Sequence, residues 1–307
     1  MRLLFLLSIL ITNITGVRAQ NHIRHNYGSS ENQYYLALEP KSKEIKGALV
    51  LLPGFGQLPE TIFSESKIPN VAYAHDILTI EMAGGPKLYA DDDVVEDINE
   101  AMKHVMETYN LSPSQFVIGG FSAGGTLALR YTEYAYEKER ITTIRPQGVF
   151  TIDSPVDLFE IWEYFERELE KGFSEVGRSE AQYVSDLMTK EIGTPKEHKA
   201  TYDRLTPFSV NMKESGNEQY LKDIGVRVYH DIDVMWQLQN RRRSLFDSNA
   251  LPASELINRL MLMGNDKAEF MQAKQPGVRS NGMRHTHSWS IVDETELVLW
   301  VEKLLED

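Results

Sequence analysis

The chain has 307 residues, of which 42% are hydrophobic, 25% are charged and none is cysteine. This composition is that of a folded globular protein and excludes low-complexity, collagen-like and disordered chains. Acidic residues outnumber basic ones by 45 to 32, and the formal net charge is −13. Polyphosphate would be repelled by this charge, which argues against nucleic-acid binding. The absence of cysteine excludes disulfides, thiolate metal sites and a cysteine nucleophile.

The first 19 residues have the layout of a secretory signal peptide. The basic Arg2 precedes an apolar run from Leu3 to Ile14, which is too short to cross a membrane as a helix. Val17 and Ala19 then place small residues at the −3 and −1 positions of a cleavage site. We therefore expect cleavage after Ala19 and a secreted or periplasmic bacterial protein with no stable membrane insertion after cleavage.

The expected mature domain, residues 20–307, alternates short apolar runs with amphipathic segments. A polar stretch over residues 20–33 is expected to be a loose lead-in, in which His22 and His25 are exposed rather than metal-binding residues. Alternating buried strands and helices predict a parallel sheet covered by helices on both faces. The expected strands are 47–52, 77–82, 116–118, 148–152, 225–229 and a weaker 268–273, and the expected helices include 94–105, 126–138 and 291–305, with Asp91, Asp92 and Asp93 at the N-terminus of the first.

The segment 157–223 interrupts this alternation, because it contains no apolar run typical of a strand. Apolar residues at helical spacing indicate one helix from Leu158 to a C-cap at Gly172 and a second from about Ser179 to Ile192. Residues 194–197 then have the pattern of a third helix start. We expect an all-helical insert that caps the carboxyl ends of the strands, with an enlarged peripheral helical bundle as the alternative.

The motif Gly120-Phe121-Ser122-Ala123-Gly124 matches GxSxG and lies between a predicted strand and a predicted helix. A tight strand-to-helix turn lifts the serine oxygen clear of the backbone, and the small flanking residues let the two elements approach each other. Ser122 is therefore the candidate nucleophile, and the backbone N–H of Ala123 is a candidate oxyanion donor. The alternative is a packing turn or a phosphate loop, but neither GK[ST] nor GxGxxG is present.

A second oxyanion donor is expected from the loop after the first predicted strand. Pro53-Gly54-Phe55-Gly56 occupies that position. Glycine lets the chain fold back so that the N–H of Phe55 faces the nucleophile, and a simple turn is the alternative.

A serine nucleophile needs a general base, and the base needs an orienting acid. Asp231 and Asp233 follow the strand at 225–229, and His285 and His287 follow the last strand. Asp153 also ends a strand and could supply the acid, although a hydrogen bond to the adjacent turn is the favoured role for it. The chain order Ser, Asp, His is that of the α/β-hydrolases.

These motifs, in this order, resemble the α/β-hydrolase superfamily. The residues that carry the resemblance are Leu49 to Gly56, Gly120 to Gly124, Val226 to Asp233 and His287-Ser288-Trp289. The resemblance implies an eight-stranded, mostly parallel sheet, a site at the carboxyl edge of its strands, and a cap formed by the insert after the sixth strand. The sequence departs from the family at Pro53, where this loop commonly begins with His-Gly.

Within the superfamily, Thr286-His287-Ser288-Trp289 is similar to the Gly-His-Asp-Trp stretch of the siderophore-esterase and S-formylglutathione-hydrolase-like esterases. This likeness favours His287 over His285 as the general base. Superfamily members usually place the acid a few residues into the loop after its strand, which favours Asp233 over Asp231.

The sequence therefore predicts a secreted serine hydrolase that cleaves an ester through an acyl-enzyme, with Ser122, His287 and Asp233 as its triad. We expect a small-molecule or saccharide-linked ester as substrate, and no metal or organic cofactor is implied. The alternatives are a single-domain serine peptidase of the same fold and a catalytically inactive α/β-hydrolase-like binding protein. Arg241-Arg242-Arg243 is expected to be a solvated helix face rather than an anion site.

Overall fold

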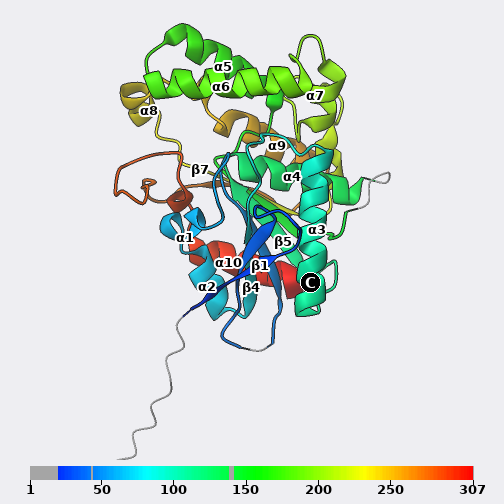
Figure 1. Cartoon of the computed structure of the whole chain (residues 1–307). Helices are drawn as coiled ribbons and strands as arrows, with labels where there is room; N and C mark the ends of the chain where they lie inside the picture. The colour runs from blue at the N-terminus through cyan, green and yellow to red at the C-terminus, as the bar shows by residue number, and fades with distance from the viewer. Residues whose placement is uncertain (1–19, 43, 138–141, 307) are drawn as a thin grey trace, which may run out of the picture.

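An eight-stranded sheet runs through the middle of the molecule, in the order β1-β2-β4-β3-β5-β6-β7-β8 (Figure 1). The computed structural model describes residues 20–42, 44–137 and 142–306, so the predicted signal peptide lies outside the described residues. The strands are β1 (His22–Asn26), β2 (Tyr34–Leu38), β3 (Gly47–Leu52), β4 (Ile77–Met82), β5 (Phe116–Phe121), β6 (Gly148–Ile152), β7 (Gly225–His230) and β8 (Ala268–Gln272). β1 and β2 pair in the antiparallel sense, and β3 to β8 are mutually parallel, which confirms the mostly parallel sheet.

β1 corrects the expectation of a loose lead-in over residues 20–33, because residues 22–26 pair with β2. β1 is an edge strand whose side chains are mostly exposed, so its sequence shows no apolar alternation. His22 packs on Phe63, and the Nε2 atom of His25 lies 3.1 Å from the Tyr109 hydroxyl. Within the described ranges no group of three or more histidine, aspartate and glutamate side chains is placed to hold a metal ion.

Helices cover both faces of the sheet and enclose two separate cores. Alternate residues of β3 point to opposite faces, so Val50 belongs to one core and Leu51 to the other. The first core packs under α3 (Asp92–Tyr109), α4 (Ala123–Tyr136) and α9 (Ala250–Leu262), and the second under α1 (Thr61–Glu65), α2 (Ile68–Ala74) and α10 (Glu294–Glu306). None of the helices among the described residues has the length and apolar character needed to span a membrane.

The N-terminus of α3 forms as the acidic run predicts. The side chain of Asp91 accepts a hydrogen bond of 3.1 Å from the backbone N–H of Val94, and Asp92 and Asp93 lie in the first turn. These negative charges lie beside the positive end of the helix dipole, which stabilises the start of the helix.

The segment between β6 and β7 folds into α5 (Leu158–Lys171), α6 (Glu175–Ile192) and α7 (Lys199–Leu205). α6 begins earlier than the sequence pattern indicated, because Ser174 caps it by accepting a hydrogen bond from the N–H of Gly177. α7 begins later, since Thr194 and Glu197 form a hydrogen-bonded turn ahead of it.

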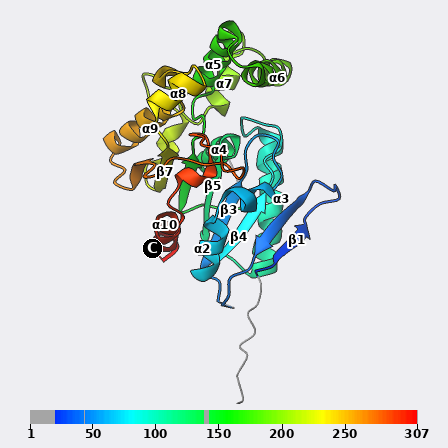
Figure 2. The ribbon, with the colours of Figure 1, turned by 90° about the vertical axis from the view of Figure 1, so that its left-hand side faces the viewer.

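These three helices share a small apolar core of their own. It includes Tyr164 and Phe165 of α5, Val184 of α6 and Tyr202 of α7, and it reaches Ala123 at the start of α4. α5 and α6 lie at the top of the molecule in Figure 1, at the end of the sheet opposite α10, and Figure 2 shows the same separation from the side. This arrangement places α5 and α6 near the carboxyl ends of the parallel strands.

Candidate active site

Ser122 lies in the sharp turn between β5 and α4. Its backbone has φ 54° and ψ −127°, a strained conformation for a residue with a side chain. The N–H of Ser122 donates a hydrogen bond of 2.9 Å to the carbonyl of Ile152 at the end of β6, which fixes the turn to the neighbouring strand. The strand–turn–helix context expected for GxSxG is therefore present.

The glycines of this motif allow the turn to lie against β3. A Cβ atom at Gly120 would come within 2.5 Å of the Leu52 carbonyl oxygen. A Cβ atom at Gly124 would come within 2.2 Å of the same oxygen and 2.3 Å of the Pro53 carbonyl oxygen. These neighbours are backbone atoms that cannot rotate away, so the close approach requires glycine.

Replacing Gly124 by alanine should therefore destabilise the whole protein. We expect a loss of roughly 2–4 kcal/mol in the free energy of unfolding, because the added methyl group forces the backbone of β3 away from α4. Gly216→Ala is the matched control, since a Cβ atom there meets only the side chains of Met212 and Glu218. Urea unfolding of both variants checks this, and equal stabilities would contradict the packing argument.

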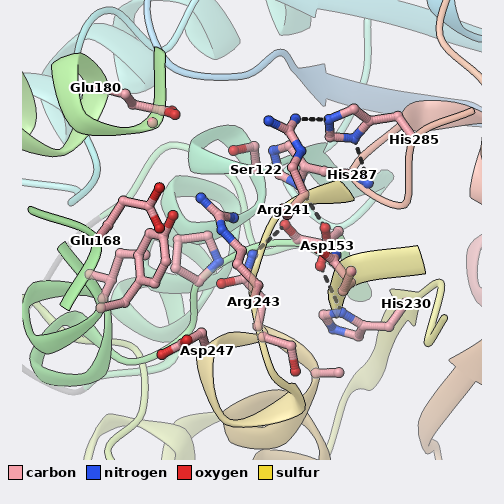
Figure 3. Close-up of a pocket in the computed structure, with 18 of the residues that line it drawn as sticks. Ser122, Asp153, Glu168, Glu180, His230, Arg241, Arg243, Asp247, His285 and His287 are labelled. Atoms are coloured by element: carbon pink, nitrogen blue, oxygen red, sulfur yellow. Dashed lines mark hydrogen bonds and ion pairs between the residues drawn. The ribbon is translucent and has the colours of Figure 1, made fainter. Parts of the chain in front are cut away.

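The serine faces a cavity of about 290 Å³ at the carboxyl edge of the sheet. Ser122, Asp153 and His287 line it from the sheet side, and residues of α5 and α6 line it from above. Figure 3 shows the labelled side chains converging on this cavity. A volume of this size suits a small ligand.

His287 is held beside the nucleophile turn by two contacts. Its Nδ1 atom lies 2.7 Å from Oδ2 of Asp153 (Figure 3). Its ring centroid lies 4.4 Å from that of Phe121, the residue directly before Ser122. A histidine that donates from Nδ1 to a carboxylate presents Nε2 as the free basic atom, which is the arrangement of a general base.

Asp153 is fixed at the end of β6 by bonds from several directions. Its N–H donates to the carbonyl of Tyr229, its carbonyl accepts from the side-chain amide of Asn249, and its Oδ1 atom lies 3.1 Å from Nδ1 of His230. Burial would raise the pKa of Asp153, but the hydrogen bonds from His230 and His287 outweigh it and bring the pKa below its ordinary value. The carboxylate is therefore charged and rigidly oriented toward His287.

This geometry corrects the expectation that Asp233 orients His287. Asp233 caps α8 (Val234–Asn240) by accepting from the N–H of Trp236, and its other oxygen lies 3.2 Å from Arg284. Asp231, the reserve candidate, also pairs with Arg284, at 2.8 Å. The sequence also allowed Asp153 as the acid, while favouring a hydrogen bond to the adjacent turn. Asp153 follows β6, which lies next to β5 in the sheet. This neighbourhood points to Asp153 as the acid, but it is visible only once the strand order is known.

His285 lies at the rim of the cavity with different partners. Its Nε2 atom contacts the guanidinium of Arg241, and its ring lies 5.4 Å from that of Trp236. Burial and the charge of Arg241 lower the pKa of His285 to about 3, so this imidazole stays neutral. Of the two histidines, the structure brings His287 to the carboxylate.

The two predicted oxyanion donors come from the loop after β3 and from the start of α4. Ala123 is the first residue of α4, where backbone N–H groups have no partner within the helix. Phe55 lies in the loop after β3 and lines the cavity. Among the described residues neither N–H group donates a hydrogen bond to the protein, so both are free to bind a ligand oxygen.

The run Arg241-Arg242-Arg243 does not form the solvated helix face that the sequence suggested. α8 ends at Asn240, and Arg242 has a left-handed φ of 53°. As a result Arg241 and Arg243 line the cavity, whereas Arg242 is exposed. The expectation assumed a continuous helix through the three residues, which the structure does not have.

No family model matches the chain, and no curated protein matches it in sequence. Solved structures do match. MPT51 (FbpC1) of Mycobacterium tuberculosis has a TM-score of 0.59 and 11% identity, covering 94% of this chain and 99% of its own. Carboxyl esterase 2 of the fungus Tuber melanosporum has a TM-score of 0.55 and 14% identity, covering 96% and 89%.

The fluorophosphonate-binding serine hydrolase F of Staphylococcus aureus is a third match, with a TM-score of 0.51 and 14% identity over 94% of this chain and 99% of its own. At such low identity the likeness concerns the fold. The strand order, the helices on both faces and the turn at Ser122 agree with it. The chain therefore has the α/β-hydrolase fold that its sequence motifs predicted.

Proposed function

We propose that this protein is a serine hydrolase that cleaves a carboxylic ester through an acyl-enzyme intermediate. The observation that carries the proposal is the 2.7 Å contact between His287 and Asp153 beside the strained turn of Ser122. A histidine fixed by a partly buried carboxylate next to a partly exposed, strained serine is the arrangement that activates a hydroxyl.

In the first step, His287 Nε2 takes the proton of Ser122 Oγ while Oγ attacks the ester carbonyl carbon. The carbonyl oxygen becomes an oxyanion, and the N–H groups of Phe55 and Ala123 stabilise it. The protonated His287 then gives its proton to the departing alcohol oxygen, which leaves the acyl group on Ser122. Asp153 stabilises the imidazolium without taking up the proton.

In the second step, water attacks the acyl-enzyme with the same general base. His287 removes a proton from water, the resulting hydroxyl adds to the acyl carbon, and Ser122 Oγ leaves with that proton. The product is a carboxylic acid, and the serine is regenerated. The small cavity supports a small-molecule or saccharide-linked ester rather than a polymer. We propose export as well, on the signal-peptide layout of residues 1–19.

A fluorophosphonate probe tests the proposal, because only an activated serine attacks phosphorus and displaces fluoride. We expect the purified protein to be labelled at Ser122, as located by peptide mass spectrometry, and Ser122→Ala to remain unlabelled. The parent protein should also hydrolyse short-chain 4-nitrophenyl esters. Absence of labelling and of turnover in the folded parent would favour an inactive binding protein, and labelling at another serine would refute the assignment of Ser122.

A further inference from the structure

Three arginines line the cavity, and none of them has a carboxylate partner among the described residues. They are Arg241, Arg243 and Arg279. Elsewhere in this acidic protein, arginines beside the cavity are paired: Arg284 with Asp231 and Asp233, and Arg167 with Asp247. The unpaired state of the first three therefore distinguishes them from their neighbours.

The guanidinium groups of two of these arginines lie against aromatic rings. Arg243 lies 4.3 Å from the ring centre of Tyr164 in α5, and Arg279 lies 5.2 Å from that of Phe121. A guanidinium beside an aromatic ring keeps N–H groups that can bind a ligand, because the ring accepts no strong hydrogen bond from them. Phe121 directly precedes Ser122, so Arg279 is held close to the proposed nucleophile.

The acids of the cavity form no ion pair with these arginines in the described part of the chain, although the charges of Asp153 and Asp247 act on Arg243 and those of Asp153 and Glu180 act on Arg279. Asp247 already pairs with Arg167 and Lys171. Glu168 of α5 and Glu180 of α6 also line the cavity. Neither forms an ion pair with an arginine of the cavity within the described part of the chain, although the charge of Arg241 acts on Glu168. Burial raises the pKa of Glu168, which favours its neutral form.

Partly buried cations without an ion pair are costly, since a guanidinium that leaves water must find other hydrogen-bond acceptors. Burial lowers the pKa of both Arg243 and Arg279, which reports this loss of solvation. A bound anion would restore the missing interactions. A carboxylate, sulfate or phosphate can accept two parallel hydrogen bonds from one guanidinium, so these groups match the available donors.

We propose that the cavity selects an ester that carries a second, anionic group, and that Arg241, Arg243 and Arg279 bind this group (Figure 3). This proposal extends the proposed function and rests on it, because it assumes that the protein hydrolyses an ester. The arginines are specificity residues: they hold the anionic end of the substrate so that its ester carbonyl lies at Ser122. The negative net charge of the rest of the protein would otherwise repel such a substrate.

The kinetic test compares matched esters. The 4-nitrophenyl monoester of succinate carries a carboxylate in its acyl part, and 4-nitrophenyl butyrate is its neutral counterpart. Acetylated 4-hydroxybenzoate carries the carboxylate in its alcohol part, and the methyl ester of that compound is neutral. We expect kcat/KM to favour the anionic member of at least one pair by about tenfold or more.

The variants Arg243→Met and Arg279→Met should each remove about tenfold or more of this preference, measured as the ratio of kcat/KM for the anionic ester to kcat/KM for the neutral ester. Arg242→Met is the matched control, because this arginine is exposed, donates to the Leu238 carbonyl and lies 5.2 Å from the ring centre of Phe173, away from the cavity lining. It should leave both substrates unchanged. Equal kcat/KM for both members of both pairs in the parent would overturn the proposal.

A binding measurement separates this proposal from the proposed function. Calorimetric titration of Ser122→Ala protein with succinate, and separately with inorganic phosphate, reads anion binding without turnover. Binding that is lost in the double variant with Arg243→Met supports the site even if the parent hydrolyses no ester, and it shows whether carboxylate or phosphate is preferred. Absence of binding by both anions, in folded protein at low salt, overturns it.

Discussion

Replacing His287 by glutamine is expected to slow ester hydrolysis by at least about a thousandfold. Glutamine keeps part of the hydrogen bonding to Asp153 but cannot take the proton from Ser122, so attack on the ester loses its general base. Single-turnover kinetics with 4-nitrophenyl butyrate measure the effect on acylation directly. The fluorophosphonate labelling rate should fall in parallel.

His285→Gln is the control for this variant. His285 has a pKa of about 3 and lies against Arg241 rather than a carboxylate, so it is poorly suited to accept and return a proton at neutral pH. We expect turnover of the neutral ester to stay within about tenfold of the parent. If the two variants show the reverse order, His285 is the base and the contact of His287 with Asp153 is structural.

Replacing Asp153 by asparagine should lower kcat by about ten-thousandfold, the size of effect expected when the carboxylate of a Ser-His-Asp triad becomes an amide. The amide is nearly the same shape, so the fold should be retained. Its NH₂ group can force His287 into the wrong tautomer, and the imidazolium formed during attack loses its counter-charge. Steady-state kinetics and circular dichroism of the variant check both expectations.

Asp233→Asn provides the matched control, because it changes the acid that the sequence favoured. Asparagine also serves as a helix cap, so α8 should keep its start, and only the exposed pair with Arg284 is weakened. We expect a loss of less than tenfold in kcat. A larger loss at Asp233 than at Asp153 would show that the loop after β7 moves to bring Asp233 to His287 during catalysis.

Much of the chemistry could be predicted from local sequence because it depends on local backbone geometry. The GxSxG motif fixed the place of Ser122, since only a strand-to-helix turn with small flanking residues meets the steric limits at Leu52 and Pro53. The fold class followed from alternating buried strands and helices, whose side-chain patterns are set over a few residues. His287 was distinguished from His285 by its neighbours in sequence.

The acid of the site was decided by the tertiary structure alone. Parallel strands precede all three candidate acids, Asp153, Asp231 and Asp233. The amino-acid sequence alone does not show which of their loops turns toward His287. Arg284, which is remote in sequence from both loop acids, pairs with Asp231 and Asp233, while His230 and His287 converge on Asp153. These contacts join residues up to 134 positions apart, and no local pattern encodes them.

The same limit explains the arginines of the cavity. Their sequence run predicted a solvated helix face, and its true arrangement depends on where α8 ends and on the left-handed Arg242. The sequence by itself thus determined the fold class and the strand-to-helix turn that holds Ser122, which depend on short-range sterics and periodicity. Only the tertiary structure decided the partner of His287 and the charge of the cavity, because both arise from side chains that distant strands and the inserted helices bring together.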